Sequence, residues 1–247
     1  MTGVLALTER LVRSGVRTLD VAFAVLAPVL TFIGFVIALR GVIDTGGISY
    51  PQYVLPAVVV QAMLFGALNT TDIAAGERAS EFGTRLRTLP ISVYAPLVAR
   101  MTYCVIRGVL ALVTTVAVAY AFGFRMEGGF LLGAAFVFLA LTLTLALSLG
   151  ADAIGARAKR SDTSSQLLLI PQLLLVLLST GMAPVGSFPG WVQPFVEHQP
   201  ISQITGTLRN FASGDVDAPN LAVTLAWCVG LLVGLGVLAL RSQRGTR

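Results

Sequence analysis

The sequence predicts an all-α integral membrane domain with six transmembrane helices. Hydrophobic residues make up 55% of the 247 residues and charged residues only 12%, whereas about 25% of an average soluble domain is charged. The mean hydropathy is +0.84, so a soluble fold of this composition would lack a polar surface. The charged residues also fall in clusters, separated by uncharged runs that are long enough to cross a bilayer.

These uncharged runs define the predicted spans, because a membrane-crossing helix needs about 20 mostly apolar residues. We predict spans at about 19–40, 52–73, 101–123, 129–151, 165–183 and 219–240. The third span contains Arg107, and Pro171 predicts a kink in the fifth. The run after the fifth span is rich in helix-breaking residues, namely Pro184, Gly186, Pro189 and Gly190.

The distribution of Lys and Arg predicts the orientation. With the amino terminus in the cytoplasm, 13 of the 17 basic residues fall in cytoplasmic segments and three in external ones. Short cytoplasmic loops are enriched in Lys and Arg, so both termini are predicted to be cytoplasmic. The first apolar run is too long for a cleavable signal and has no small-residue cleavage pattern after it. We therefore expect a multi-pass protein of the plasma membrane.

Residues 3–17, before the first span, predict an amphipathic helix. Val4, Leu7, Leu11 and Val12 recur at helical spacing, with arginines between them. A helix of this kind lies in the membrane interface. The alternative is a basic flank that only sets the topology.

The loop after the second span predicts a cytoplasmic helix at about 77–89. Glu81 and Arg85 are spaced for an i, i+4 ion pair, and a proline follows the helix. One face carries an apolar ridge of Phe82, Leu86 and Leu89. Such a ridge suits docking into a groove on a soluble partner. The alternative is a surface helix that rests on the membrane helices.

The connection at 184–217 predicts an external re-entrant segment with two short amphipathic helices before the last span. The first has an apolar patch of Val192, Phe195 and Val196. The second opens at a proline and has an apolar stripe of Ile201, Ile204, Leu208 and Phe211. Non-helical backbone at membrane depth must be buried in protein or wetted by a cavity. An ordered external cap is the alternative.

Few residues could carry chemistry. Intramembrane ionisable side chains are functional candidates, and Asp20, Asp72 and Arg107 are the strong ones, with anchors or helix–helix ties as the alternative. One histidine and two cysteines argue against a His-based metal site and a disulfide scaffold. Lys159 follows Ala158, so it does not form the Gly-Lys-Ser/Thr of a phosphate-binding loop. We expect no catalytic residue, cofactor or metal in this chain, and an energy source in another chain.

One stretch of about 30 residues, together with the predicted topology, resembles a known family. The stretch reads STGMAP at 179–184, FPGWVQPF at 188–195, QPIS at 199–202 and LR at 208–209. With six spans, cytoplasmic termini and a docking helix after the second span, the chain resembles the ABC-2 type transporter permeases. Within that family it resembles the DrrB/DrrC branch, the actinobacterial daunorubicin and lipid exporter permeases.

The resemblance implies a half-transporter. Two permeases would combine with two copies of a cytoplasmic DrrA-like ABC ATPase, which would bind ATP and Mg, and a paralogue is favoured over a second copy as partner permease. The helix at 77–89 would be the coupling helix. Its ATPase-coupling residues would be Glu77, Glu81, Phe82, Arg85, Leu86 and Leu89. The implied cargo is an amphipathic drug or a complex envelope lipid, and no nucleic-acid partner is expected.

A substrate path is predicted along the second and fifth spans. The candidate residues are Phe65, Asn69, Gln172 and Met182. Trp191 and Phe195 are candidates for an outer gate, or for interface anchors. Apolar walls with few polar groups suit lipid-like cargo rather than sugars or ions. Two other functions stay open: a self-contained secondary carrier or channel, and a membrane-embedded lipid-modifying enzyme.

Overall fold

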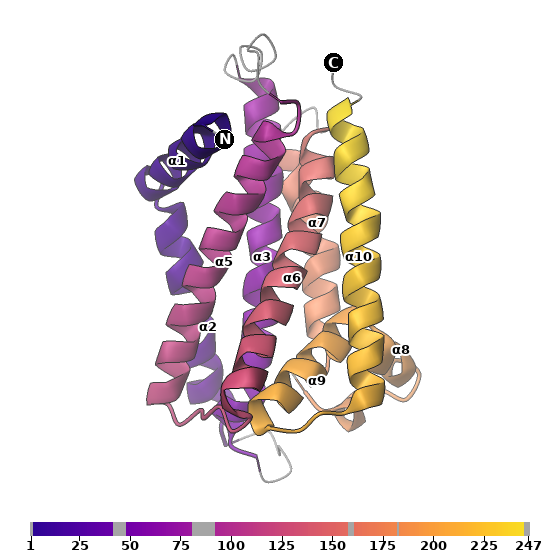
Figure 1. The fold of residues 1–247 in the computed structure, drawn as a ribbon. Coiled ribbons are helices and arrows are strands. Elements are labelled where there is room, and N and C mark those ends of the chain that lie inside the picture. Colours follow the sequence, from indigo (N-terminus) through magenta and orange to yellow (C-terminus); the bar gives the residue numbers. More distant parts are fainter. Residues whose placement is uncertain (1, 42–47, 81–91, 158–160, 182, 245–247) are drawn as a thin grey trace.

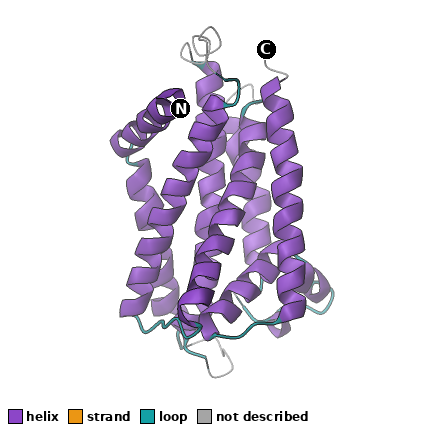
Figure 2. Ribbon diagram, viewed as in Figure 1, coloured by secondary structure: helices purple, strands orange, loops and turns teal. Residues whose placement is uncertain are grey.

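The computed structural model describes the chain except for residues 1, 42–47, 81–91, 158–160, 182 and 245–247. The described residues form helices and connecting turns, without a β-strand (Figure 2). This confirms the predicted all-α fold. Five helices are long and apolar enough to cross a membrane, and they run side by side as a bundle (Figure 1). These helices are α2 (Asp20–Leu39), α3 (Tyr50–Ala79), α5 (Ala95–Ala121), α6 (Gly129–Gly155) and α10 (Ala218–Arg244).

A shorter helix occupies the place of the predicted fifth span. Helix α7 (Ser161–Leu177) has 17 residues, and its apolar part is Leu168–Leu177. At 1.5 Å per residue such a helix extends about 26 Å, a little less than the hydrocarbon core of about 30 Å. The chain then turns where the Ser179 hydroxyl donates a hydrogen bond to the Val176 carbonyl at 2.7 Å. The described chain thus has five full-length candidate spans and one shorter helix, where the sequence predicted six spans.

Helix α3 is the central element of the bundle. It packs against α2, α5, α6, α7 and α9. Of its apolar window 72% is buried, against 39% or less in the other long helices. Side chains such as Val54, Val58 and Met63 form the core around it. The other long helices therefore leave much of their apolar surface for lipid or for another chain.

Helices α3 and α5 continue past the charge-free runs that predicted them. Helix α3 extends to Ala79, so Glu77 lies within α3 and not in a separate helix at 77–89. Helix α5 begins at Ala95 and includes Arg100, which was expected in a loop. The remaining predicted coupling residues lie outside the described residues: Glu81, Phe82, Arg85, Leu86 and Leu89.

Both chain termini lie at the same end of the bundle (Figure 1). Helix α1 (Thr2–Arg17) lies at this end and packs through Leu11 on Ala99 and Tyr103 of α5. The four apolar residues predicted to share one face of α1 all belong to this small cluster. The exposed Arg13 forms an ion pair with Glu9 one turn earlier.

The opposite end of the bundle carries three short helices in the segment predicted to be re-entrant. These are η1 (Val185–Ser187), α8 (Gln193–His198) and α9 (Pro200–Ser213). The predicted stripe of α9 is buried against the bundle. Near the carboxyl end of α9 the Glu127 amide donates to the Ala212 carbonyl at 2.8 Å. A Cβ on Gly128 would lie 2.3 Å from the Phe211 carbonyl oxygen, so only glycine permits this close approach.

Candidate functional site

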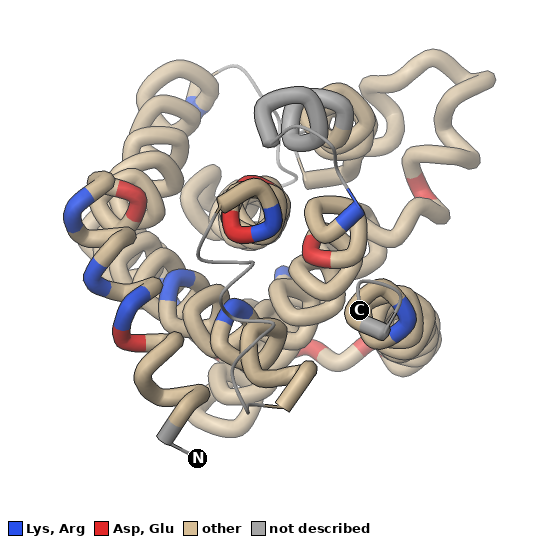
Figure 3. The backbone as a smooth tube through the Cα atoms, turned by 90° about the horizontal axis from the view of Figure 1, so that it is seen from above, with Lys and Arg blue, Asp and Glu red and all other residues tan. Residues whose placement is uncertain are grey.

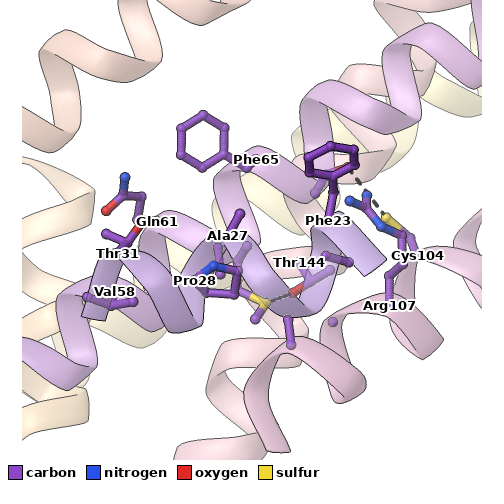
Figure 4. Close-up of a pocket in the computed structure, with 16 residues that line it drawn as sticks. Phe23, Ala27, Pro28, Thr31, Val58, Gln61, Phe65, Cys104, Arg107 and Thr144 are labelled. Carbon is purple, nitrogen blue, oxygen red and sulfur yellow. Dashed lines mark hydrogen bonds between the residues drawn. The ribbon is translucent and has the colours of Figure 1, made fainter. Parts of the chain in front are cut away.

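An apolar cavity of about 200 Å³ lies among α2, α3, α5 and α6 (Figure 4). Its apolar wall includes Phe23, Ala27, Pro28, Val58, Phe65 and Ala111. Its polar lining groups include Thr31, Gln61, Thr144 and Arg107. Figure 4 shows Arg107 at one end of the labelled residues, Gln61 at the other end, and Phe65 between them. A small number of polar groups in an apolar wall is the usual composition of a site for an organic ligand.

Arg107 forms an ion pair with Asp20 at the start of α2. The Arg107 Nη2 atom lies 3.2 Å from Asp20 Oδ1. The other oxygen of Asp20 accepts hydrogen bonds from the Tyr103 hydroxyl at 2.5 Å and from the Asn69 amide at 3.2 Å. Asp20 therefore ties α2 to α3 and α5. Pairing of this kind reduces the cost of placing charges at membrane depth.

A second cavity, of about 230 Å³, lies among α1, α3, α5 and the start of α2. Its lining is polar and includes Arg10, Asp20, Asn69, Asp72, Glu77 and Tyr103. The Tyr103 side chain reaches Asp20 across Gly15, where a Cβ would lie 2.0 Å from the tyrosine oxygen. Because Asp20 lines this cavity and Arg107 lines the apolar one, their ion pair stands between the two.

A buried charge cluster joins five helices at the end of the bundle that carries the termini. Arg100 of α5 donates from Nε to Asp152 of α6 at 2.5 Å and from Nη1 to Glu77 of α3 at 2.6 Å. Gln243 of α10 donates to the second oxygen of Asp152 at 3.0 Å. Arg10 of α1 lies 3.4 Å from Glu77. Figure 3, which views the bundle from above, shows charged residues over several neighbouring helices.

The sequence interpretation missed this cluster. The predicted spans end at residue 151 and begin at residue 101, which placed Asp152 and Arg100 just outside them, whereas Asp152 exposes no surface and Arg100 only 6%. Asp152 and Arg100 each lie within a few positions of the end of an apolar run, and the predicted topology places both at the same side of the membrane. That shared depth was the one signal in the sequence that could have suggested a pair.

The predicted substrate-path residues separate into different places. Phe65 lines the apolar cavity, while Asn69, one turn further along α3, lines the polar cavity. Gln172 is buried in α7 and lines neither cavity. Met182 lies outside the described residues.

The predicted gate residues lie at the opposite end of the bundle. Trp191 is 86% exposed and Phe195 is 51% exposed. At the same end, Arg209 of α9 donates to the Tyr53 carbonyl at 3.2 Å, and its guanidinium lies 3.9 Å from the centre of the Tyr53 ring. Burial lowers the pKa of Arg209, and the neighbouring Tyr53 partly offsets that effect. The Tyr53 hydroxyl donates to the Thr180 carbonyl at 2.9 Å, so α9 and α3 together hold the connection after α7.

The described part of the chain holds no group of three or more His, Cys, Asp or Glu residues placed to bind a metal ion. The arrangement is therefore best understood through its two cavities and the charged residues beside them. An apolar cavity suits a hydrophobic ligand, and a buried charge cluster at one end suits the mechanical linking of helices.

Comparison with known proteins identifies the family. Residues 43–241 match the family described as "ABC-2 family transporter protein". The doxorubicin resistance ABC transporter permease protein DrrB of Mycobacterium tuberculosis is 33% identical over 237 residues, which cover 90% of this chain and 81% of that protein. The daunorubicin resistance ABC transporter permease protein DrrB1 of Streptomyces coeruleorubidus is 28% identical, with 89% and 78% covered. The probable doxorubicin resistance permease protein DrrC of M. tuberculosis is 25% identical, with 73% and 65% covered.

These matches confirm the resemblance inferred from the sequence. They also agree with a structure that has five helices able to cross a membrane. The chain belongs to the ABC-2 family of transporter proteins, as a multi-pass membrane permease.

Proposed function

We propose that this permease is the membrane subunit of an ATP-driven exporter that moves hydrophobic or amphipathic molecules out of the cell. The apolar cavity among α2, α3, α5 and α6 carries the proposal, because its wall offers extensive apolar surface and few polar groups. Amphipathic drugs and complex envelope lipids both have this chemistry. The relatives named for doxorubicin and daunorubicin resistance support the drug class.

We place the end of the bundle that carries both termini in the cytoplasm. This orientation follows from the 13 basic residues that the predicted topology assigns to that side. Helix α1 would then lie in the inner interface, and the segment 184–217 with Trp191 and Phe195 would lie at the outer face. α7 would be the sixth, shorter crossing.

ATP and Mg would bind to two copies of a separate cytoplasmic ABC ATPase. Glu77 lies near the end of α3, immediately before the segment proposed to dock the ATPase. Through Arg100 this glutamate is joined to Asp152, and so to α5 and α6. A movement of the docked segment would therefore reach three of the long helices through direct ionic contacts.

A second permease would complete the transporter. Only 11% of the apolar window of α10 and 17% of that of α2 is buried within this chain. These faces can contact lipid or the partner permease. Relatives named DrrB and DrrC occur in one organism, which favours a paralogue as the partner.

Copurification tests the assignment of the subunit. The chain would be coexpressed with a candidate cytoplasmic ABC ATPase and purified in mild detergent. We expect the ATPase to copurify with the wild type and to be lost with Phe82→Asp and Leu86→Asp. The control is Val216→Asp, which places the same charge at an exposed apolar position at the opposite end of the bundle.

Transport is the second test. Inverted membrane vesicles that contain the permease pair and the ATPase should accumulate doxorubicin, followed by its fluorescence, when ATP is added. Accumulation without ATP would support a secondary carrier. The exporter function would be contradicted if no ATPase copurified with the folded wild-type chain and the vesicles accumulated no amphiphile.

A further inference from the structure

We infer that the apolar cavity is a binding site for an acidic amphiphile, whose carboxylate or phosphate oxygens bond to Arg107. That this ligand is exported cargo rests on the proposed function, whereas its binding to the cavity does not. The inference comes from the hydrogen-bonding capacity that Arg107 has left over.

Arg107 is 9% exposed, and its Nε and Nη1 atoms are buried without a hydrogen-bond partner among the described residues. Its contact with Asp20 uses only Nη2, at 3.2 Å. Buried donors are normally hydrogen-bonded, because a buried donor without a partner has lost its hydrogen bonds to water and has formed none in their place. The two free nitrogens therefore indicate an acceptor that arrives from outside the chain.

Asp20 does not supply that acceptor. Its two oxygens already receive hydrogen bonds or ionic contacts from Arg107, Tyr103 and Asn69. The carboxylate is thus shared among three donors, while the guanidinium has one long contact. The groups left unpaired are hydrogen-bond donors of Arg107, so a matching ligand must supply acceptor oxygens. Ionised oxygens suit best, since guanidinium groups form their strongest hydrogen bonds with carboxylates and phosphates.

The rest of the cavity fits the apolar body of such a ligand. Phe23 and Phe65 line it and are themselves 65% and 38% exposed, so the cavity wall continues to the lipid-facing surface. From Phe23 to Thr31 the α2 wall extends over eight residue steps, which is roughly 12 Å. A cavity of about 200 Å³ would hold the head and the first part of the body, with the remainder reaching past the exposed phenylalanines.

The chain offers a site where the cavity can be filled without touching Arg107. Gly66 lines the cavity, and a Cβ built there meets no atom within 4 Å. A leucine at this position has room to enter the cavity. It would displace the apolar body of any ligand, whatever the ligand's head group.

Binding would be measured on the purified full-length chain in neutral detergent, without the ATPase. The probes are oleate and oleyl alcohol, which share one chain and differ in the head group, with oleoyl lysophosphatidic acid as the phosphate probe. We expect oleate or the phosphate probe to bind the wild type about tenfold more tightly than the alcohol does. Whichever of the two acids binds more tightly would show whether a carboxylate or a phosphate is preferred.

Three variants locate the site. Arg107→Gln should lower the affinity for the acid about tenfold and leave the affinity for the alcohol unchanged. Gly66→Leu should weaken the binding of both probes, and Arg241→Gln, at an exposed arginine outside the cavity, should weaken the binding of neither. A thermal-unfolding scan of each variant would verify folding. If Arg107→Gln does not fold, Asp20→Asn would be added to it, because this removes the carboxylate that the loss of Arg107 leaves unpaired.

Three outcomes would overturn the inference. The first is equal affinity of the wild type for acid and alcohol, and the second is a preference for the acid that survives the loss of Arg107. The third is acid binding that Gly66→Leu leaves intact, because the site would then lie outside this cavity. A chain that binds the acid as described but exports nothing with its ATPase would contradict the proposed function alone.

Discussion

Arg100 and Asp152 form a buried ion pair between α5 and α6, with 2.5 Å between Nε and Oδ1. The two residues are 52 positions apart in the chain, and each lies in a helix able to cross a membrane. A single buried charge at this depth would be strongly unfavourable, and the pair removes most of that cost. The contact therefore fixes how α5 and α6 meet near the end of the bundle.

Removing one partner of this pair should destabilise the protein strongly. Asp152→Ala leaves Arg100 with Glu77 as its only remaining ionic contact in the cluster. We expect a loss of about 3–5 kcal/mol in unfolding free energy. Combining it with Arg100→Met should restore part of the loss, because the buried guanidinium nitrogen that faced Asp152 is then removed while Glu77 keeps its contact with Arg10. Thermal or denaturant unfolding in detergent would measure both effects as a double-mutant cycle.

The exposed pair of Glu9 and Arg13 on α1 provides the control. Both side chains are more than half exposed, so Glu9→Gln should change the unfolding free energy by about 1 kcal/mol or less. If Asp152→Ala were no more harmful than this surface substitution, the Arg100–Asp152 contact would not be a structural tie.

Gly155 permits the close packing of α6 on α3. A Cβ at this position would lie 2.4 Å from the Thr71 carbonyl oxygen and 2.9 Å from the Ala74 Cβ. Gly155→Ala should therefore force the helices apart and cost about 1–3 kcal/mol. Gly234→Ala in α10 is the matched control, because its Cβ would meet no atom within 4 Å. There alanine should be neutral or stabilising by up to about 1 kcal/mol. Unfolding temperatures of the two variants, measured side by side, decide the point.

The comparison of these glycines shows what a single sequence could predict about the fold. Uncharged runs located the five long helices, since hydropathy reports burial in lipid or protein. Glycines four residues apart can allow two helices to pack closely, and Gly230 and Gly234 of α10 have this spacing, yet a Cβ at either meets nothing within 4 Å in this chain. The close approach is at Gly155 instead. Glycine spacing does not report which face of a helix meets a neighbour, because helix rotation depends on the whole bundle.

The functional site was only partly predictable, for a related reason. Asp20 and Arg107 were identified as candidates because charge is rare in apolar runs, and the structure shows them to be partners. Arg100 was placed just before the third predicted span, and Glu77 was placed in a separate helix at 77–89, because the spans were drawn around the uncharged runs. In the structure the helices continue through these charges, since Asp152 and Arg10 compensate them. Partnership between distant residues cannot be read from one chain's local pattern.

Tyr53 is predicted to stabilise the other end of the bundle. Its hydroxyl donates to the Thr180 carbonyl, and its own carbonyl accepts from Arg209. Tyr53→Phe keeps the ring under the guanidinium but leaves the Thr180 carbonyl with the Arg209 contact at 3.3 Å alone. We expect a loss of about 0.5–1.5 kcal/mol in unfolding free energy. Tyr120→Phe, at a more exposed tyrosine, is the control, and an equal loss in both would contradict a specific role for Tyr53.

Glu77 is predicted to link the ATPase-docking segment to the bundle. Glu77→Gln keeps the size of the side chain but removes the charge that faces Arg100 at 2.6 Å and Arg10 at 3.4 Å. A hydrogen bond to a charged group contributes about 1.5–3 kcal/mol, so the end of α3 should loosen from α5. The ATPase should still copurify, because the apolar ridge proposed for docking is intact. ATP hydrolysis should continue while ATP-driven accumulation of amphiphile in vesicles falls about tenfold or more.

Two comparisons separate this uncoupling from simpler defects. Glu9→Gln removes an acidic charge from the exposed surface at the same end of the chain and should leave transport unchanged. Phe82→Asp should abolish both copurification and transport. If Glu77→Gln lost the ATPase as Phe82→Asp does, Glu77 would belong to the docking surface. If it lowered hydrolysis and transport in equal proportion with the ATPase still bound, the ionic link from α3 to α5 and α6 would not transmit the movement that drives export.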